Sequence, residues 1–149
     1  IDDFAHNPDK IAAALATARA RIGVGGAAGG RVLAVFQPHG FGPTRFLRDA
    51  LVATFIESLA EGDILWLPEI FFAGGTVTRD ISSGDLVKEV AAAGRDARFG
   101  PDRADLPASI AEEARPGDLV LVMGARDPSL TDFCRKIRAA LLERRPAES

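Results

Sequence analysis

The stretch RVLAVFQPHGFGPTRFLRDALVATFIESLAEGDILWLPEI, residues 31–70, decides the fold. Two continuous apolar runs, 31–36 and 63–70, predict buried strands. Between them, apolar residues recur at i, i+4 spacing over a helix from about Thr44 to Ala60. The helical repeat consists of Leu47, Leu51, Phe55 and Leu59. Continuous apolar strands joined by an amphipathic helix indicate a parallel sheet that is covered on both faces.

The same alternation of strand and helix extends in both directions from this stretch. A strand tail ends at Phe4, and Asn7 and Pro8 suit the N-cap and first position of a helix. The remaining predicted elements are a helix opened by SSGD at 82–85, a strand at 95–100, a helix at 105–115, a strand at 118–124 and a closing helix from Leu130 to Leu141. The fold class is therefore α/β: a Rossmann-like, three-layer domain with a mostly parallel sheet flanked by helices.

Length and composition limit the classes of protein to which the chain can belong. Its 149 residues suit one domain, 1–149, with a disordered tail expected at about 144–149. The net charge of −3 and the absence of a basic stripe argue against nucleic-acid binding. No apolar run approaches the roughly 20 residues that span a bilayer, so no membrane association is expected. The single cysteine, Cys134, fits a reducing compartment, and we expect a cytoplasmic protein with a buried structural thiol.

The glycine-rich loop GVGGAAGG at 23–30 has the spacing of a dinucleotide-binding fingerprint. That motif works only when a strand precedes it and a helix follows, so that the helix N-terminus meets the pyrophosphate. Here a helix precedes and a strand follows, so a flexible connection is the better interpretation. The sequence also contains no G-x-x-x-x-G-K-[ST] phosphate loop.

Both histidines of the chain, His6 and His39, directly follow predicted strands. Because ligands bind at the carboxyl ends of parallel strands, we expect the two side chains at one edge of the sheet. Asp3 precedes the first helix and is either a helix-capping carboxylate or an acceptor for ribose hydroxyls. Arg45 lies in the first turn of a helix, where the dipole disfavours a cation, so an anion should hold it: Asp49 at i+4 or a ligand.

Four motifs of the sequence, in this order, resemble those of one enzyme family. DDFAHNP at 2–8 resembles the motif that opens the C-terminal domain of the Mur ligase and folylpolyglutamate synthetase superfamily. FQPHGFGPTR, ISSGDL and GDLVLVMGARD resemble the later signatures of the muramate-ligase branch, which comprises UDP-N-acetylmuramate–L-alanine ligases and murein tripeptide ligases. The resemblance extends from Asp2 to about Leu142. It implies that the chain is the third domain, cut from a longer three-domain ligase.

The resemblance implies ATP-dependent amide synthesis, in which a muramoyl carboxylate is activated as an acyl phosphate and an amino group attacks. The partners it implies are a UDP-N-acetylmuramate-type substrate, an amino acid or peptide, and the N-terminal and central domains of the same ligase. Those two domains would hold most of the Mg²⁺ contacts. By the same resemblance, Asp3, His6 and Asn7 would contact ATP on domain closure. Phe4, His6, His39 and Arg45 would contact the substrate, and the 149 residues alone would be inactive. Apart from the resemblance, Arg126 follows the last predicted strand, so we expect it at the same edge and in contact with the substrate.

The sequence departs from the family pattern in the second motif. L-Alanine ligases read QPH-R-x-x-R there, and the two arginines help to hold the amino-acid carboxylate, whereas this chain has Gly40 and Pro43. Phe4 also replaces the usual tyrosine, and ARDPS replaces the usual AGD after the last strand. Bidentate pairing of arginine with a carboxylate is hard to replace, so we expect a bulkier amino acid or a peptide as substrate.

Two other classes of function remain open on the sequence. One is a non-catalytic, nucleotide- or partner-binding Rossmann-like module. The other is an enzyme complete in 149 residues. The sequence argues against it, because it shows no phosphate loop, no convincing Ser–His–Asp set and no metal cluster.

Overall fold

The computed structural model describes residues 2–3, 6–25, 29–72, 74–76, 78–125 and 128–144, with the backbone alone at residues 2, 3, 24 and 25. Within them lies one parallel sheet in the spatial order β1-β5-β2-β3-β4. Its strands are β1 (Asp2–Asp3), β2 (Val32–Gln37), β3 (Ile64–Leu67), β4 (Asp96–Phe99) and β5 (Leu119–Gly124).

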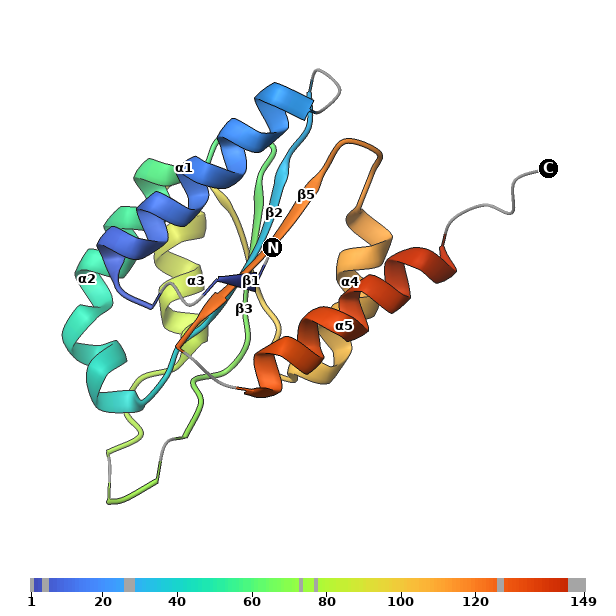
Figure 1. Cartoon of the computed structure of the whole chain (residues 1–149). Helices are drawn as coiled ribbons and strands as arrows, with labels where there is room; N and C mark the ends of the chain where they lie inside the picture. Colours follow the sequence, from blue (N-terminus) through green and yellow to red (C-terminus); the bar gives the residue numbers. More distant parts are fainter. Residues whose placement is uncertain are drawn as a thin grey trace.

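Helices cover both faces of this sheet, as the sequence predicts (Figure 1). Three helices pack on one face: α1 (Pro8–Gly25), α2 (Phe41–Ser58) and α3 (Ser83–Ala92). The other face is covered by α4 (Leu106–Glu113) and α5 (Pro128–Glu143), with a short 3₁₀ helix, η1 (Arg103–Asp105), before α4. The predicted α/β, Rossmann-like three-layer arrangement is confirmed.

Strand β2 shows why the sheet needs two layers of helices. All six of its residues are buried. Val32, Ala34 and Phe36 belong to the hydrophobic cluster under α1, α2 and α3. Leu33 and Val35 belong to the cluster under α4 and α5. Side chains alternate between the two faces of a strand, so a continuous apolar run is buried only when both faces are covered.

Two helix starts form as the sequence predicts. The Asn7 side-chain oxygen accepts a hydrogen bond from the backbone N–H of Lys10 at 3.0 Å, which caps α1 before Pro8. Ser82 and Asp85 form a reciprocal capping box at the start of α3. These caps fix where each helix leaves the loop that follows a strand, and those loops build the carboxyl edge of the sheet.

Two predicted helix boundaries differ in detail. Helix α2 begins at Phe41 rather than near Thr44, because proline is tolerated in a first helical turn and Pro43 does not delay the start. Helix α1 continues to Gly25, so the first part of the glycine-rich loop is helical. The expectation of a buried thiol is wrong in extent, because Cys134 lies at the border of the α5 face and is only half-buried against the core. Arg144 donates a hydrogen bond to the Ala111 carbonyl, and the rest of the expected tail lies outside the described residues.

The opposite, amino edge of the sheet is closed by two acidic residues. Asp63 is 2% exposed and accepts hydrogen bonds from the backbone N–H groups of Val32 and Ala60, at 2.9 and 2.8 Å, and from Arg19. Asp118 forms an ion pair with Arg31 at 2.7 Å. Each of these carboxylates joins segments that are far apart in the sequence.

The ion pair of Arg31 and Asp118 shifts the pKa values of both groups toward the charged forms. Burial raises the pKa of the Asp118 carboxyl, but hydrogen bonds from the Arg31 guanidinium and from backbone N–H groups outweigh burial and lower the pKa below its usual value. The hydrogen bond to Asp118 raises the pKa of Arg31. The pair is therefore charged across the ordinary pH range and joins the segments that precede β2 and β5 at the amino edge.

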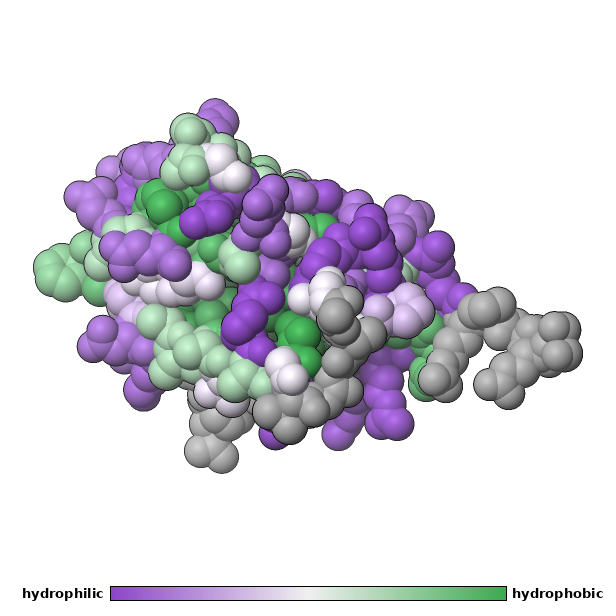
Figure 2. Space-filling model, turned by 90° about the horizontal axis from the view of Figure 1, so that it is seen from above, coloured by the Kyte–Doolittle hydropathy of each residue, from purple (hydrophilic) through white to green (hydrophobic). Residues whose placement is uncertain are grey.

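The face of the molecule seen in Figure 2 is mixed in polarity. Hydrophilic residues make up most of the face seen in Figure 2, with hydrophobic residues visible between them. Among the described helices, none is long and apolar enough to cross a membrane.

Candidate functional site

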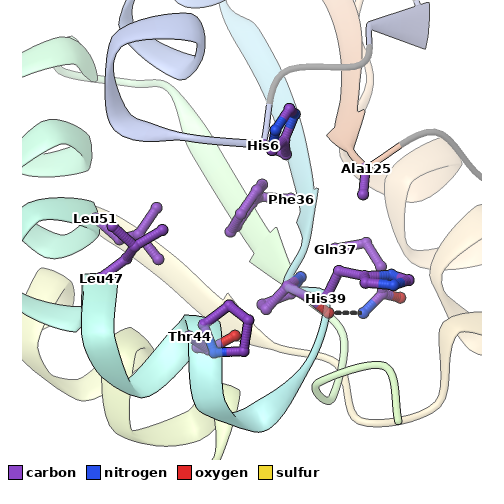
Figure 3. A pocket seen from close by; sticks show the side chains of 10 residues that line it. His6, Phe36, Gln37, His39, Thr44, Leu47, Leu51 and Ala125 are labelled. Atoms are coloured by element: carbon purple, nitrogen blue, oxygen red, sulfur yellow. Dashed lines mark hydrogen bonds between the residues drawn. The ribbon is translucent and has the colours of Figure 1, made fainter. Parts of the chain in front are cut away.

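A cavity of about 240 Å³ opens at the carboxyl edge of the sheet (Figure 3). His6, from the segment before α1, lies on one side of it, and His39, from the loop after β2, lies on the other. Phe36, Leu47 and Leu51 supply apolar walls. The structure thus brings together the two histidines that the sequence assigns to one edge, although 33 positions separate them along the chain.

The loop after β2 is fixed by a backbone ladder that continues past the strand. The Pro38 carbonyl accepts the Phe71 N–H, and the Gly40 N–H donates to the Phe71 carbonyl, both at 2.9 Å. His39 lies between these two bonds and is itself exposed. Its ring stacks on that of Phe71, with centroids 4.9 Å apart and planes inclined by 18°. The loop therefore holds an accessible imidazole in a defined orientation beside the cavity.

Gly40 and Pro43 form a coupled pair at the start of α2. Gly40 has a φ of 83°, which residues with a side chain rarely adopt, and a Cβ there would lie 3.2 Å from the Pro43 Cδ. The Thr44 hydroxyl donates to the Gly40 carbonyl at 2.7 Å and ties the turn to the helix. An arginine in place of Gly40 would therefore require a different backbone, and not only a different side chain.

Gln37 connects the cavity to the opposite face of the sheet. Its amide nitrogen donates to the carbonyls of Pro38 and Glu69, at 3.1 and 2.8 Å, and its amide oxygen accepts from Arg103 at 3.3 Å. The Glu69 carboxylate in turn accepts from the Ser82 hydroxyl and the Ser83 N–H at the start of α3. Sequence reasoning missed Arg103 and Glu69 because no local motif contains either residue, although both follow strands.

The anion that holds Arg45 is Asp80, and the expectation of Asp49 is wrong. The Arg45 guanidinium donates to the Asp80 carboxylate at 2.9 Å and to the Thr78 carbonyl at 2.7 Å. Residue 80 lies in the loop before α3, which folds back against the start of α2, so local helical spacing does not reveal the partner. The described cavity lining does not include Arg45, and its hydrogen bonds join the start of α2 to that loop.

The remaining predicted site residues lie at or near the carboxyl edge, and the structure describes only some of their side chains. The Asn7 side-chain oxygen is occupied as the cap of α1. Asp3 ends strand β1 at the carboxyl edge, but its side chain lies outside the described part, as do Phe4 and Arg126. Ala125, the neighbour of Arg126, lines the cavity. Among the described residues, no group of three His, Cys, Asp or Glu side chains is placed to hold a metal ion.

The family can be decided by comparison with known proteins. A family model described as "Mur ligase, glutamate ligase domain" matches residues 1–126, which is most of the chain. The chain belongs to the Mur ligase family.

Relatives of this Mur ligase domain include UDP-N-acetylmuramate–L-alanine ligases from several bacteria. The enzyme of Cutibacterium acnes is 42% identical over 130 residues, which are 87% of this chain and 26% of that protein. The enzyme of Verminephrobacter eiseniae is 38% identical over 126 residues, 84% of this chain and 24% of that protein. The chain thus spans about a quarter of the length of the curated relatives it matches.

A solved structure shares the fold of the Mur ligase domain. It is a domain assigned to a UDP-N-acetylmuramate:L-alanyl-γ-D-glutamyl-meso-diaminopimelate ligase from Haemophilus ducreyi. The TM-score is 0.62 at 23% identity, and the match covers 94% of this chain and 88% of the other. The arrangement of sheet and helices that places His6 and His39 together is therefore a fold known for such domains.

Proposed function

We propose that this Mur ligase domain is the C-terminal domain of an ATP-dependent ligase that joins an amino acid or peptide to UDP-N-acetylmuramate in peptidoglycan synthesis or recycling. One observation carries the proposal: two motifs typical of the family bring His6 and His39 to one cavity at the carboxyl edge of the sheet. Ligand sites in open α/β sheets lie at this edge. The relatives named as UDP-N-acetylmuramate–L-alanine ligases support the reaction class.

The size of the cavity indicates which part of the site this chain supplies. About 240 Å³, with apolar walls and two imidazoles at its rim, suits an adenine, a ribose or an amino-acid side chain, but not a whole nucleotide triphosphate. We therefore propose that the N-terminal and central domains of a longer ligase complete the site on closure. Those domains would also hold Mg²⁺, since the described residues form no metal cluster.

Within this proposal, the residues of the carboxyl edge bind and orient. Asp3 would accept the ribose hydroxyls of ATP, and His6 and Asn7 would contact the nucleotide. Phe4, His6, His39 and Arg126 would contact the incoming amino acid or peptide, while Arg45 would act by fixing the loop before α3. ATP, when bound, supplies the phosphoryl group that activates the carboxylate. We also propose a cytoplasmic location, on the single cysteine.

The proposed specificity follows from the turn at Gly40. Neither Gly40 nor Pro43 carries a charged side chain, and Pro43 lines the cavity. The turn therefore leaves room for a group larger than alanine, and the carboxylate must meet another cation. We propose that a bulkier amino acid or a peptide is ligated in preference to L-alanine.

The test is a ligation assay with the full-length protein, UDP-N-acetylmuramate, ATP and a panel of amino acids and short peptides. We expect ATP-dependent product with at least one bulky member of the panel and no turnover by the 149-residue chain alone. Asp3→Ala should weaken ATP use by about 1.5–3 kcal/mol, the usual contribution of a charged hydrogen bond. Absence of product with every acceptor would contradict the function, and efficient use of L-alanine would contradict only the specificity.

A further inference from the structure

A second cavity at the carboxyl edge, of about 350 Å³, lies between η1 and the start of α5. Its charged lining residues are Asp102, Arg103, Asp132 and Lys136. The segments that form it follow β4 and β5, so it opens at the same edge as the histidine cavity but on the face covered by α4 and α5. Gln37 lines the histidine cavity and accepts a hydrogen bond from Arg103, so it links the two.

The two carboxylates of this cavity are engaged within the chain. Asp102 accepts a hydrogen bond from the backbone N–H of Ala104 at 2.9 Å and caps η1. Asp132 pairs with Arg135 at 3.1 Å. Among the described residues, neither of them forms an ion pair with Arg103 or Lys136.

Arg103 is half-buried, and its hydrogen-bond partners among the described residues are uncharged. Its guanidinium donates to the Ser129 hydroxyl at 2.7 Å and to the Gln37 amide oxygen at 3.3 Å, and it lies 5.5 Å from the centre of the Phe133 ring. Within the described part of the chain, no carboxylate lies within 4.0 Å of Arg103 or of Lys136. This sets Arg103 apart from Arg31, Arg45 and Arg98, each of which meets a carboxylate.

The geometry leaves Arg103 able to bind an anion. A guanidinium has five N–H donors in a planar fork, and the described contacts of Arg103 use two of them. A half-buried charge is stabilised when an anion accepts its remaining donors, and two oxygens of one group can accept two of them together. Lys136 adds a second positive charge to the lining. The cavity therefore has two cations without a carboxylate partner among the described residues, and space for a small anion.

We propose that the cavity lined by Arg103 and Lys136 binds the anionic oxygen group of a ligand, a carboxylate or a phosphate. The proposal depends on the proposed function only for the source of that anion: the carboxylate of the incoming amino acid or peptide, or a phosphate of the nucleotide. Arg103 would supply a positive charge in place of the two arginines of the family pattern, whose positions are Gly40 and Pro43 in this chain. The Gln37 amide would then couple occupancy of this cavity to the loop that carries His39.

The test is a titration of the 149-residue chain with sodium phosphate and, separately, with sodium acetate, against sodium chloride at equal ionic strength. The signals to follow by NMR are the backbone amides of Ala104 and Ser129 and the Arg103 Nε–H. We expect saturable shifts with at least one of the two anions. Arg103→Gln should weaken binding about tenfold or more, and Lys136→Gln by a smaller factor. Arg103→Lys, which keeps the charge but loses the fork, should fall between the original chain and Arg103→Gln.

Arg138→Gln is the matched control, because it removes one positive charge from the same helix outside this cavity. Binding of phosphate alone would assign the cavity to a phosphate group, and binding of acetate alone would assign it to a carboxylate. Binding of both would support the anion site for either source. Two results would overturn the proposal: no saturation by either anion, or equal affinity in the original chain and Arg103→Gln. Since the titration involves no ligation, its failure beside an active ligase would remove only this site, and an inactive ligase with a positive titration would remove only the proposed function.

Discussion

The two edges of the sheet use their charged residues in opposite ways. At the amino edge, Asp63 and Asp118 are satisfied by backbone N–H groups and by Arg19 and Arg31. At the carboxyl edge, His39 is exposed beside a cavity, and Arg103 is held by uncharged partners. The amino edge joins strands and helices to one another. The carboxyl edge also contains an internal pair, Arg45 with Asp80, but its Arg103 has donors that we propose for a ligand. The comparison teaches that a charged residue paired within the chain stabilises the fold, whereas a charged residue without such a pair can bind a ligand.

The largest expected effect is at the amino edge. Asp63→Ala would leave the buried N–H of Val32 without its acceptor and Arg19 without its partner. We expect the free energy of unfolding to fall by about 2–4 kcal/mol, because the N–H groups of Val32 and Ala60 both lose their acceptor and a buried unsatisfied donor costs about 1–3 kcal/mol, while Arg19 is partly exposed. Urea unfolding followed by circular dichroism measures the loss. Asp96→Ala, at the exposed pair with Arg98, is the control and should cost less than about 1 kcal/mol; similar losses in the two variants would break the comparison.

The second effect concerns the turn at Gly40. Gly40→Arg should destabilise the domain by about 1–3 kcal/mol, because the residue has a φ of 83° and a Cβ there would crowd Pro43. Pro43→Arg, at an exposed position of the same turn, should change stability by no more than about 1 kcal/mol. The free energies of unfolding of the two variants decide the matter. If Gly40→Arg were as stable as Pro43→Arg, the backbone of this turn would not be the reason for the glycine.

The third effect is a dependence on pH. The pKa of Asp118 is lower in the folded chain than its ordinary value of 3.8, so the unfolded chain takes up the proton first as the pH falls. The stability that the pair contributes is therefore present above the unfolded pKa and is lost as the pH falls through the folded pKa. Asp118→Asn should lose stability at neutral pH and show a shallower decline below about pH 4. Parallel decline of both proteins, in unfolding curves from pH 6 to pH 2, would show that Asp118 is not the titrating group.

The smallest effect is expected at the carboxyl edge. His39→Ala removes an exposed imidazole and its stack on Phe71, and should change the free energy of unfolding by no more than about 1 kcal/mol. Differential scanning calorimetry of the 149-residue chain provides the check. A loss as large as that of Asp63→Ala would mean that His39 serves the fold and not a ligand.

The fold could be predicted from the sequence because its signals are local. The buried strands are continuous apolar runs, and the helix starts carry their own caps at Asn7 and Ser82. The apolar spacing places the start of α2 too late. The helix begins directly after Gly40, whose positive φ is a property of the backbone that apolar spacing does not reveal. Rossmann-like topology then placed His6 and His39 at one edge.

The remainder of the site could not be predicted because it depends on contacts between distant segments. Arg45 meets Asp80, which is 35 positions away, and Arg103 meets Gln37, which is 66 positions away. No spacing rule relates such pairs, since their separation is set by how loops pack at the edge of the sheet. The predicted roles of Asp3, Phe4 and Arg126 stay predictions, because their side chains lie outside the described residues.

The central claim is that the carboxyl edge, and above all the cavity between His6 and His39, serves a ligand of a peptidoglycan ligase. The most direct measurement is kcat/KM for ATP-dependent ligation by the full-length protein and its His39→Ala and Asp96→Ala variants, with the melting temperature of each. The account predicts a loss of about tenfold or more for His39→Ala, with an unchanged melting temperature and with normal activity of Asp96→Ala. An unchanged kcat/KM for His39→Ala, or a loss that merely follows unfolding, would contradict it.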